Sequence, residues 1–134
     1  MKHFILDPHM TASVGGAFYP TGHTFVMFPD ADDAARVGHR LLDVGFSGDE
    51  IYLIPPKVVL EQIAPTVREA DSPLPSAGTD AATVRAYARL AREGHTALLV
   101  RTKDEAAANQ LMEHVRTVPF SIAQRYRRLV IEDL

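Results

Sequence analysis

The sequence has no cysteine and no tryptophan among its 134 residues, and aromatic residues make up only 7% of it. Without cysteine the chain forms no disulfide and offers no thiolate to a metal or substrate, which excludes the disulfide-stapled scaffolds of small secreted proteins. Long apolar runs are missing too, because the one near the N-terminus is interrupted by Asp7 and Pro8. That run is too short for a signal sequence or a membrane span, so we expect a cytoplasmic protein without a membrane partner.

Basic charge is not in excess either. The 14 lysines and arginines are outnumbered by 17 acidic residues, which leaves a formal net charge of −3. A basic surface is the usual footprint of nucleic-acid binding, so no nucleic-acid partner is expected. The composition is that of an ordinary globular protein, 46% apolar and 23% charged, in a chain of about one domain's length.

An internal repeat is the most informative feature that is present. The segment His23–Phe28 matches His95–Val100, and at the same offset Asp32–Ala35 matches Asp104–Ala107. Each copy has an apolar run of strand length, a polar break and an acidic pair that favours a helix N-terminus. The matches are short, but they indicate a strand-then-helix unit that occurs twice.

Two strand–helix–strand units whose strands share one sheet predict an α+β fold of the ferredoxin-like, split βαβ type, with helices on one face. The same order of elements also fits a doubly wound parallel sheet. Within a single domain, 1–134, we expect an N-terminal segment (1–22), a first βαβ half (23–54), a helical insertion (55–94) and a second βαβ half (95–134).

The insertion lies between the second and third strands of the repeat and is expected to hold two helices. The first begins at Pro56 or Lys57 and is ended or kinked by Pro65, and the second is capped by Thr79. In the tail, apolar residues at helical spacing predict a helical turn over residues 122–126, followed by a strand over residues 129–131.

The two central strands are apolar at consecutive positions, Phe25–Phe28 and Ala97–Val100. Such runs indicate strands that are buried on both faces of the sheet. The repeat supplies helices for one face only, so the other must be covered by the insertion, by the N-terminal segment or by a second subunit. A homodimer is one expected answer.

The first half also resembles a known family. Phe25–Ala35, followed by Leu41–Leu53 with its Gly45-Phe46 step, is similar to the opening of bacterial general-stress proteins of the heat-induced YflT-like type. The resemblance covers about residues 23–54, and that family has no established catalytic residues to carry over. It implies a bacterial, cytoplasmic protein with an accessory or stress-related role.

Only one candidate ligand site stands out in the sequence. The loop that ends at Gly78 and Thr79 could place free backbone N–H groups at a helix N-terminus, where they attract phosphate or carboxylate, with Arg85 two turns on. Asp80 puts a negative charge in the same turn, and an ordinary capped helix is the favoured explanation of the pattern. No metal site and no cofactor are expected, because no pair of histidines has a metal-binding spacing.

His23 and His95 occupy matching positions at the starts of their strands. In the ferredoxin-like order these strands are antiparallel, which places the two imidazoles at opposite ends of the sheet and favours structural roles. The stripe Arg85, Arg89 and Arg92 reads as a solvated helix face, and Arg125, Arg127 and Arg128 read as a partner-facing tail.

Three classes of function therefore remain open. The first is a non-enzymatic, stress-related interaction or structural domain. The second is a sensor for a small molecule or anion that uses the helical insertion. The third is a minor enzyme with loop-borne residues, since no catalytic set can be singled out.

Overall fold

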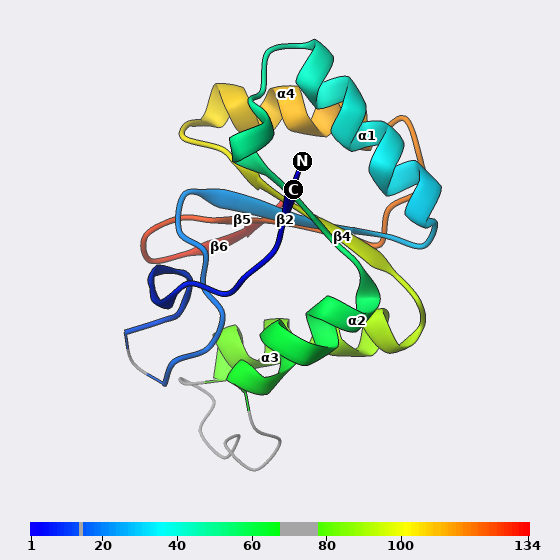
Figure 1. The fold of residues 1–134 in the computed structure, drawn as a ribbon. Helices are drawn as coiled ribbons and strands as arrows, with labels where there is room; N and C mark the ends of the chain where they lie inside the picture. The colour runs from blue at the N-terminus through cyan, green and yellow to red at the C-terminus, as the bar shows by residue number, and fades with distance from the viewer. Residues whose placement is uncertain (14, 68–77) are drawn as a thin grey trace.

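A computed structural model describes residues 1–13, 15–67 and 78–134, with the side chains of 78 and 79 left out. The fold is α+β, with one six-stranded mixed sheet and helices on both of its faces (Figure 1). The strands are as follows: β1 (Lys2–His3), β2 (His23–Phe28), β3 (Ile51–Ile54), β4 (Thr96–Arg101), β5 (Ile122–Tyr126) and β6 (Ile131–Asp133).

The sheet has the strand order β1-β3-β4-β2-β5-β6. Only β1 and β3 pair in parallel, and the other neighbouring strands of the described chain are antiparallel. This pairing contradicts the alternative of a doubly wound parallel sheet, whose strands need a parallel partner on each side. The two strands of the repeat, β2 and β4, lie side by side at the centre.

Helices α1 (Ala31–Asp43) and α4 (Glu105–Val115) cover one face of the sheet. Each begins at an aspartate whose carboxylate accepts a backbone N–H of the first turn, Asp30 for α1 and Asp104 for α4. Their apolar sides pack with Val26 and Leu98 of the central strands in one buried cluster. The repeat predicted both strand–helix pairs.

The helical insertion covers the opposite face (Figure 1). Its first helical stretch begins as α2 (Pro56–Val58), continues as a π-helical segment (Val59–Ile63) and ends in a 3-10 turn (Ala64–Thr66) that contains Pro65. The second helix is α3 (Gly78–Arg92). Thr79 lies inside this helix rather than before it, so the helix begins two residues earlier than a cap at Thr79 predicts, an ordinary error at a helix end.

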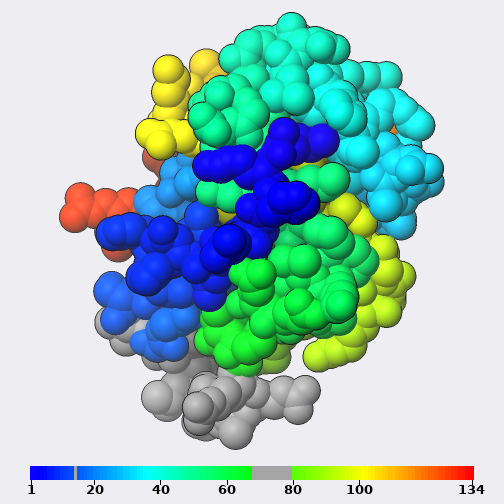
Figure 2. All heavy atoms as spheres, in the orientation of Figure 1, coloured from blue at the N-terminus to red at the C-terminus, as the bar shows by residue number. Residues whose placement is uncertain are grey.

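The N-terminal segment completes the cover of this face. Phe4 and Phe18 are buried in the same cluster as Phe25 and Leu99 of the central strands. The Phe18 N–H donates to Thr66 Oγ1 at 3.0 Å, which fastens the segment to the insertion. Figure 2 shows the N-terminal residues, in dark blue, lying between the cyan residues of α1 and the green residues of the insertion.

Both faces of the central strands are thus covered from within the chain. The consecutive apolar runs predicted this double burial, and Phe25–Phe28 and Ala97–Val100 are indeed fully buried. Of the three expected ways to cover the second face, the inserted helices and the N-terminal segment are the two that the structure shows. The sheet faces therefore give no reason for a homodimer.

The tail differs from its expectation. Residues 122–126 form strand β5 instead of a helical turn, and the final strand is Ile131–Asp133, two residues later than expected. Ile122 and Tyr126 are four residues apart, a spacing that puts side chains on one side of a helix and equally on one face of a strand. The pattern alone could not separate the two.

Candidate functional site

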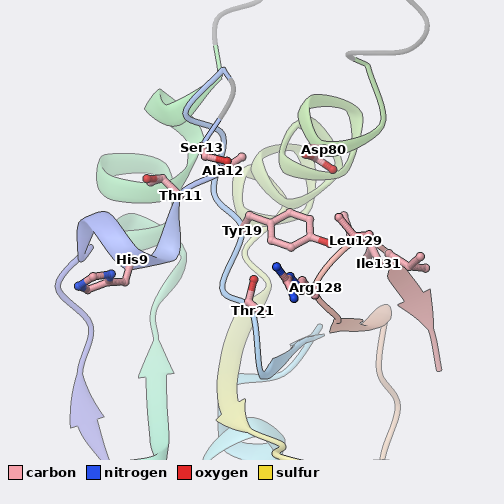
Figure 3. A pocket seen from close by; sticks show the side chains of 11 residues that line it. His9, Thr11, Ala12, Ser13, Tyr19, Thr21, Asp80, Arg128, Leu129 and Ile131 are labelled. Atoms are coloured by element: carbon pink, nitrogen blue, oxygen red, sulfur yellow. The ribbon is translucent and has the colours of Figure 1, made fainter.

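A cleft of about 650 Å³ lies where the N-terminal segment meets α3 and the turn between β5 and β6. Its lining comes from these parts of the chain (Figure 3): His9, Thr11, Ala12, Ser13, Tyr19 and Thr21 from the first, Asp80 from α3, Arg128, Leu129 and Val130 from the turn, and Ile131 from the start of β6. The lining combines hydroxyls, opposite charges and an apolar wall.

Tyr19 lies in the middle of the cleft, between Asp80 and Arg128 in the view of Figure 3. Its hydroxyl donates to the carbonyl oxygen of Arg127 at 2.6 Å, which ties the N-terminal segment to the β5–β6 turn. Burial raises the pKa of the Tyr19 hydroxyl, and the carboxylate of Asp80 raises it further. The negative charge of Asp80 therefore acts on the Tyr19 hydroxyl.

The two charged side chains of the cleft have no ion-pair partners among the residues that the structure describes. Neither Asp80 nor Arg128 takes part in the four ion pairs found there. Asp80 is half-buried and Arg128 is exposed. A carboxylate and a guanidinium on separate walls can each hold an opposite charge of one ligand.

Beneath the cleft lies a buried hydrogen-bond chain that fixes α3 to the sheet. The Tyr87 hydroxyl donates to Gln124 Oε1 at 2.6 Å and lies 2.8 Å from the Tyr126 hydroxyl, which must then donate to it. Gln124 in turn donates to Asp133 of β6 at 2.9 Å. Burial raises the pKa of both Tyr87 and Tyr126, so both hydroxyls stay protonated at neutral pH.

The predicted anion cradle is only partly within the described residues. The backbone of Gly78 and Thr79 forms the first turn of α3, whereas residues 73–77 of the loop lie outside them. Arg85 is half-buried and lines neither the cleft nor the second pocket described below. Its Nη1 atom is buried without a hydrogen-bond partner among the described residues. The site formed by Gly78, Thr79 and Arg85 therefore stays a prediction.

The two repeat histidines lie at opposite ends of the sheet, as expected. In the antiparallel register His23 is opposite Arg101, and the start of β4 is opposite Phe28. His95 lies within hydrogen-bond distance of Ser121, with 2.6 Å between its Nδ1 and the hydroxyl oxygen. Among the described residues no group of three or more histidine and acidic side chains is placed to hold a metal ion.

The arginines divide between the surface and the cleft. Arg89 pairs with Glu93 and Arg125 with Glu132, each at 3.8 Å, whereas Arg128 lines the cleft. The tail arginines were expected to face a partner, and Arg128 is the one placed where a ligand could reach it.

The helices in the part of the chain that the structure describes include none with the length and apolar character that a membrane span needs.

Sequence reasoning missed the cleft, although it had noted two of its residues. In the sequence Asp80 counts against anion binding and Arg128 belongs to a charged tail. Tyr19, His9 and Thr21 carried no signal, because they lie in a segment without periodic structure. No family model, no curated protein and no solved structure matches this chain.

Proposed function

We propose that this chain is a small-molecule-binding domain whose cleft takes a polar ligand with both a cationic and an anionic group, such as a free amino acid. The observation that carries this proposal is the pair Asp80 and Arg128, two opposite charges on separate walls of one cleft that have no ion-pair partner within the described part of the chain. Its volume of about 650 Å³ falls within the range of small-molecule sites.

Each wall has a distinct role in this proposal. The Asp80 carboxylate accepts hydrogen bonds from the ammonium group, and the Arg128 guanidinium donates to the carboxylate. Leu129 and Ile131 offer apolar surface to a side chain, and the hydroxyls of Thr11 and Thr21 remain for polar groups. The ligand would bridge the N-terminal segment, the insertion and the β5–β6 turn.

The test is a thermal-shift screen with the free amino acids, with matched amines and carboxylic acids as single-charge controls. A ligand present at a hundred times its Kd adds about 2.7 kcal/mol of stability. Asp80→Asn and Arg128→Gln should each abolish the shift, whereas the matched surface variants Glu113→Gln and Arg92→Gln should keep it. No shift with any zwitterion, or an equal loss in the surface variants, contradicts the proposal.

The stress-related interaction role is the second candidate, and the resemblance of residues 23–54 supports it. A sensor and an interaction domain are compatible, because a ligand that bridges three segments would change the surface offered to a partner protein. A bacterial, cytoplasmic setting belongs to the same proposal. A minor enzyme with loop-borne residues stays an alternative, which turnover of a ligand found in the screen would favour.

The ferredoxin-like assignment is likewise our proposal for the central four strands. Their order β3-β4-β2-β5 and the position of α1 and α4 on one face support it. Strands β1 and β6 and the inserted helices would then be additions to that core. A homodimer stays a prediction, which light scattering at micromolar concentration checks.

A further inference from the structure

A second, smaller pocket of about 310 Å³ lies beside the cleft and shares His9 and Thr21 with it. Its floor is the end of the sheet at which β2 begins and β4 ends. His23 and Arg101 are directly opposite each other in the register of these two strands. Side chains paired in this way have Cβ atoms about 5 Å apart.

His23 and Arg101 lie on the sheet face that the N-terminal segment covers. The alternation of β2 puts His23 on the same face as Phe25, and that of β4 puts Arg101 on the same face as Leu99. Lys2 adds a second cation from β1, where its ammonium group lies 5.1 Å from the centre of the Tyr52 ring. Two cations, Lys2 and Arg101, therefore line the pocket together with His23.

Arg101 has no ion-pair partner among the described residues. The pocket also contains two carboxylates, which are exposed, as Arg101 is, and neither forms an ion pair with Arg101. Asp7 caps the turn at Pro8 by accepting the His9 N–H at 2.9 Å, and Asp49 lies in the turn before β3. Arg101 thus keeps a planar fork of donors that matches an oxyanion.

The hydrogen bond between His23 and Thr21 decides which ring nitrogen faces a ligand. Its Nδ1 lies 3.1 Å from the carbonyl oxygen of Thr21, which can only accept, so Nδ1 carries the proton and Nε2 is the free nitrogen. Burial lowers the pKa of His23, the Thr21 bond raises it, and the charge of Arg101 lowers it again. The ionisable residues that line the pocket with it are Lys2, Asp7, His9, Asp49, Tyr52 and Arg101, and Tyr126 of β5 is its other strand neighbour.

From this placement we infer that the small pocket is a binding site for an oxyanion, a phosphate or carboxylate group held by the Arg101 guanidinium and the His23 imidazole. The bound anion gives Arg101 the negatively charged partner that it lacks among the described residues. It also favours a proton on His23 Nε2, which then becomes a second donor to the anion. This site is separate from the pair Asp80 and Arg128 and does not depend on the function proposed for the cleft.

The experiment follows the His23 ring signals by NMR in a low-salt, phosphate-free buffer, with inorganic phosphate in one titration and acetate in another. We expect a saturable shift of the His23 signals and a rise of its pKa with one or both anions. A response to phosphate alone identifies a phosphate group, and a response to acetate alone identifies a carboxylate. No saturable shift with either anion overturns the inference.

The variants locate the site. Arg101→Gln should weaken binding about tenfold or more, because it removes charge-assisted hydrogen bonds, and Arg101→Lys should retain part of the affinity. Arg92→Gln removes the same charge elsewhere and Arg128→Gln alters only the cleft, so both should bind as the parent does. An equal loss in Arg92→Gln overturns the inference. Because Arg101 is exposed and unpaired, its variants should keep the parent's urea midpoint, which confirms that they fold.

Discussion

The hydrogen-bond chain under the cleft makes a quantitative prediction for Tyr87→Phe. Tyr87 is fully buried and Tyr126 is 1% exposed, so neither hydroxyl can turn to water. Removing the Tyr87 oxygen deprives the Tyr126 O–H of its acceptor and Gln124 Oε1 of its donor. A buried polar group left without a partner costs about 1–3 kcal/mol.

We therefore expect Tyr87→Phe to lower the free energy of unfolding by about 2–3 kcal/mol, because the buried Tyr126 hydroxyl is orphaned. For a domain of this size that corresponds to a fall in Tm of about 6–12 °C. Tyr126→Phe should cost less, about 1 kcal/mol, because the bond from Tyr87 to Gln124 survives. Urea unfolding followed by circular dichroism measures all of these values.

Two further variants make this prediction specific. Tyr52→Phe is the matched control, because the Tyr52 side chain is half-buried and among the described residues its hydroxyl has no hydrogen bond. The double variant Tyr87→Phe/Tyr126→Phe should cost less than the sum of the single ones, because it removes the orphaned hydroxyl as well. If Tyr126→Phe proves the more damaging, or Tyr87→Phe matches Tyr52→Phe, the chain of donors described here is wrong.

Three other predictions concern the pH dependence of stability and the N-cap of α4. Burial raises the folded-state pKa of Tyr87 and Tyr126, so their contribution to stability should be complete below pH 10. Above pH 10 the free energy of unfolding should fall by up to about 1.4 kcal/mol per pH unit for each tyrosine. Urea titrations from pH 9 to 11 should show this slope, and the double phenylalanine variant should lose it. Burial is the main cause that lowers the folded-state pKa of His23. The contribution of His23 to the free energy of unfolding should therefore be present above about pH 6.5 and lost below it. His23→Gln should flatten the acid side of a plot of stability against pH. Asp104→Ala should cost about 1 kcal/mol, because it removes the N-cap of α4, and Glu105→Ala in the same turn should cost clearly less in the same unfolding assay.

Much of the α+β architecture could be predicted, because each copy of the repeat has strong local sequence patterns for a strand and for the start of a helix. An apolar strand followed by an aspartate and an amphipathic helix predicts β2 with α1 and β4 with α4. The two copies are not aligned at their caps, however. Asp32 matches Asp104 in the sequence, yet the cap of α1 is Asp30, and Asp32 lies in the first turn. Either position favours a helix N-terminus, so the prediction survived a shift of two residues.

The weaker elements could not be predicted, for reasons of length and partnership. Strand β1 has two residues, Lys2 and His3, too few for any alternation to show. Phe18 gave no sign of being fully buried, because it lies in a segment without periodic structure and its four aromatic contacts, Phe4, Phe25, Tyr87 and Tyr126, come from distant parts of the chain. Burial of this kind is decided by tertiary packing and not by local pattern.

The cleft also arises from tertiary packing, which explains why the sequence did not reveal that Asp80 and Arg128 line one cavity. At the sequence level Asp80 needs no explanation beyond the helix dipole, and Arg128 none beyond solvation. They become a pair only because the N-terminal segment docks on the insertion and places Tyr19 against Arg127 and Tyr126. Phe18, next to Tyr19, anchors that segment in the core. The ligand binding that we propose therefore depends on the docking of the segment, and any change that loosens the segment should remove the cleft without altering either charge.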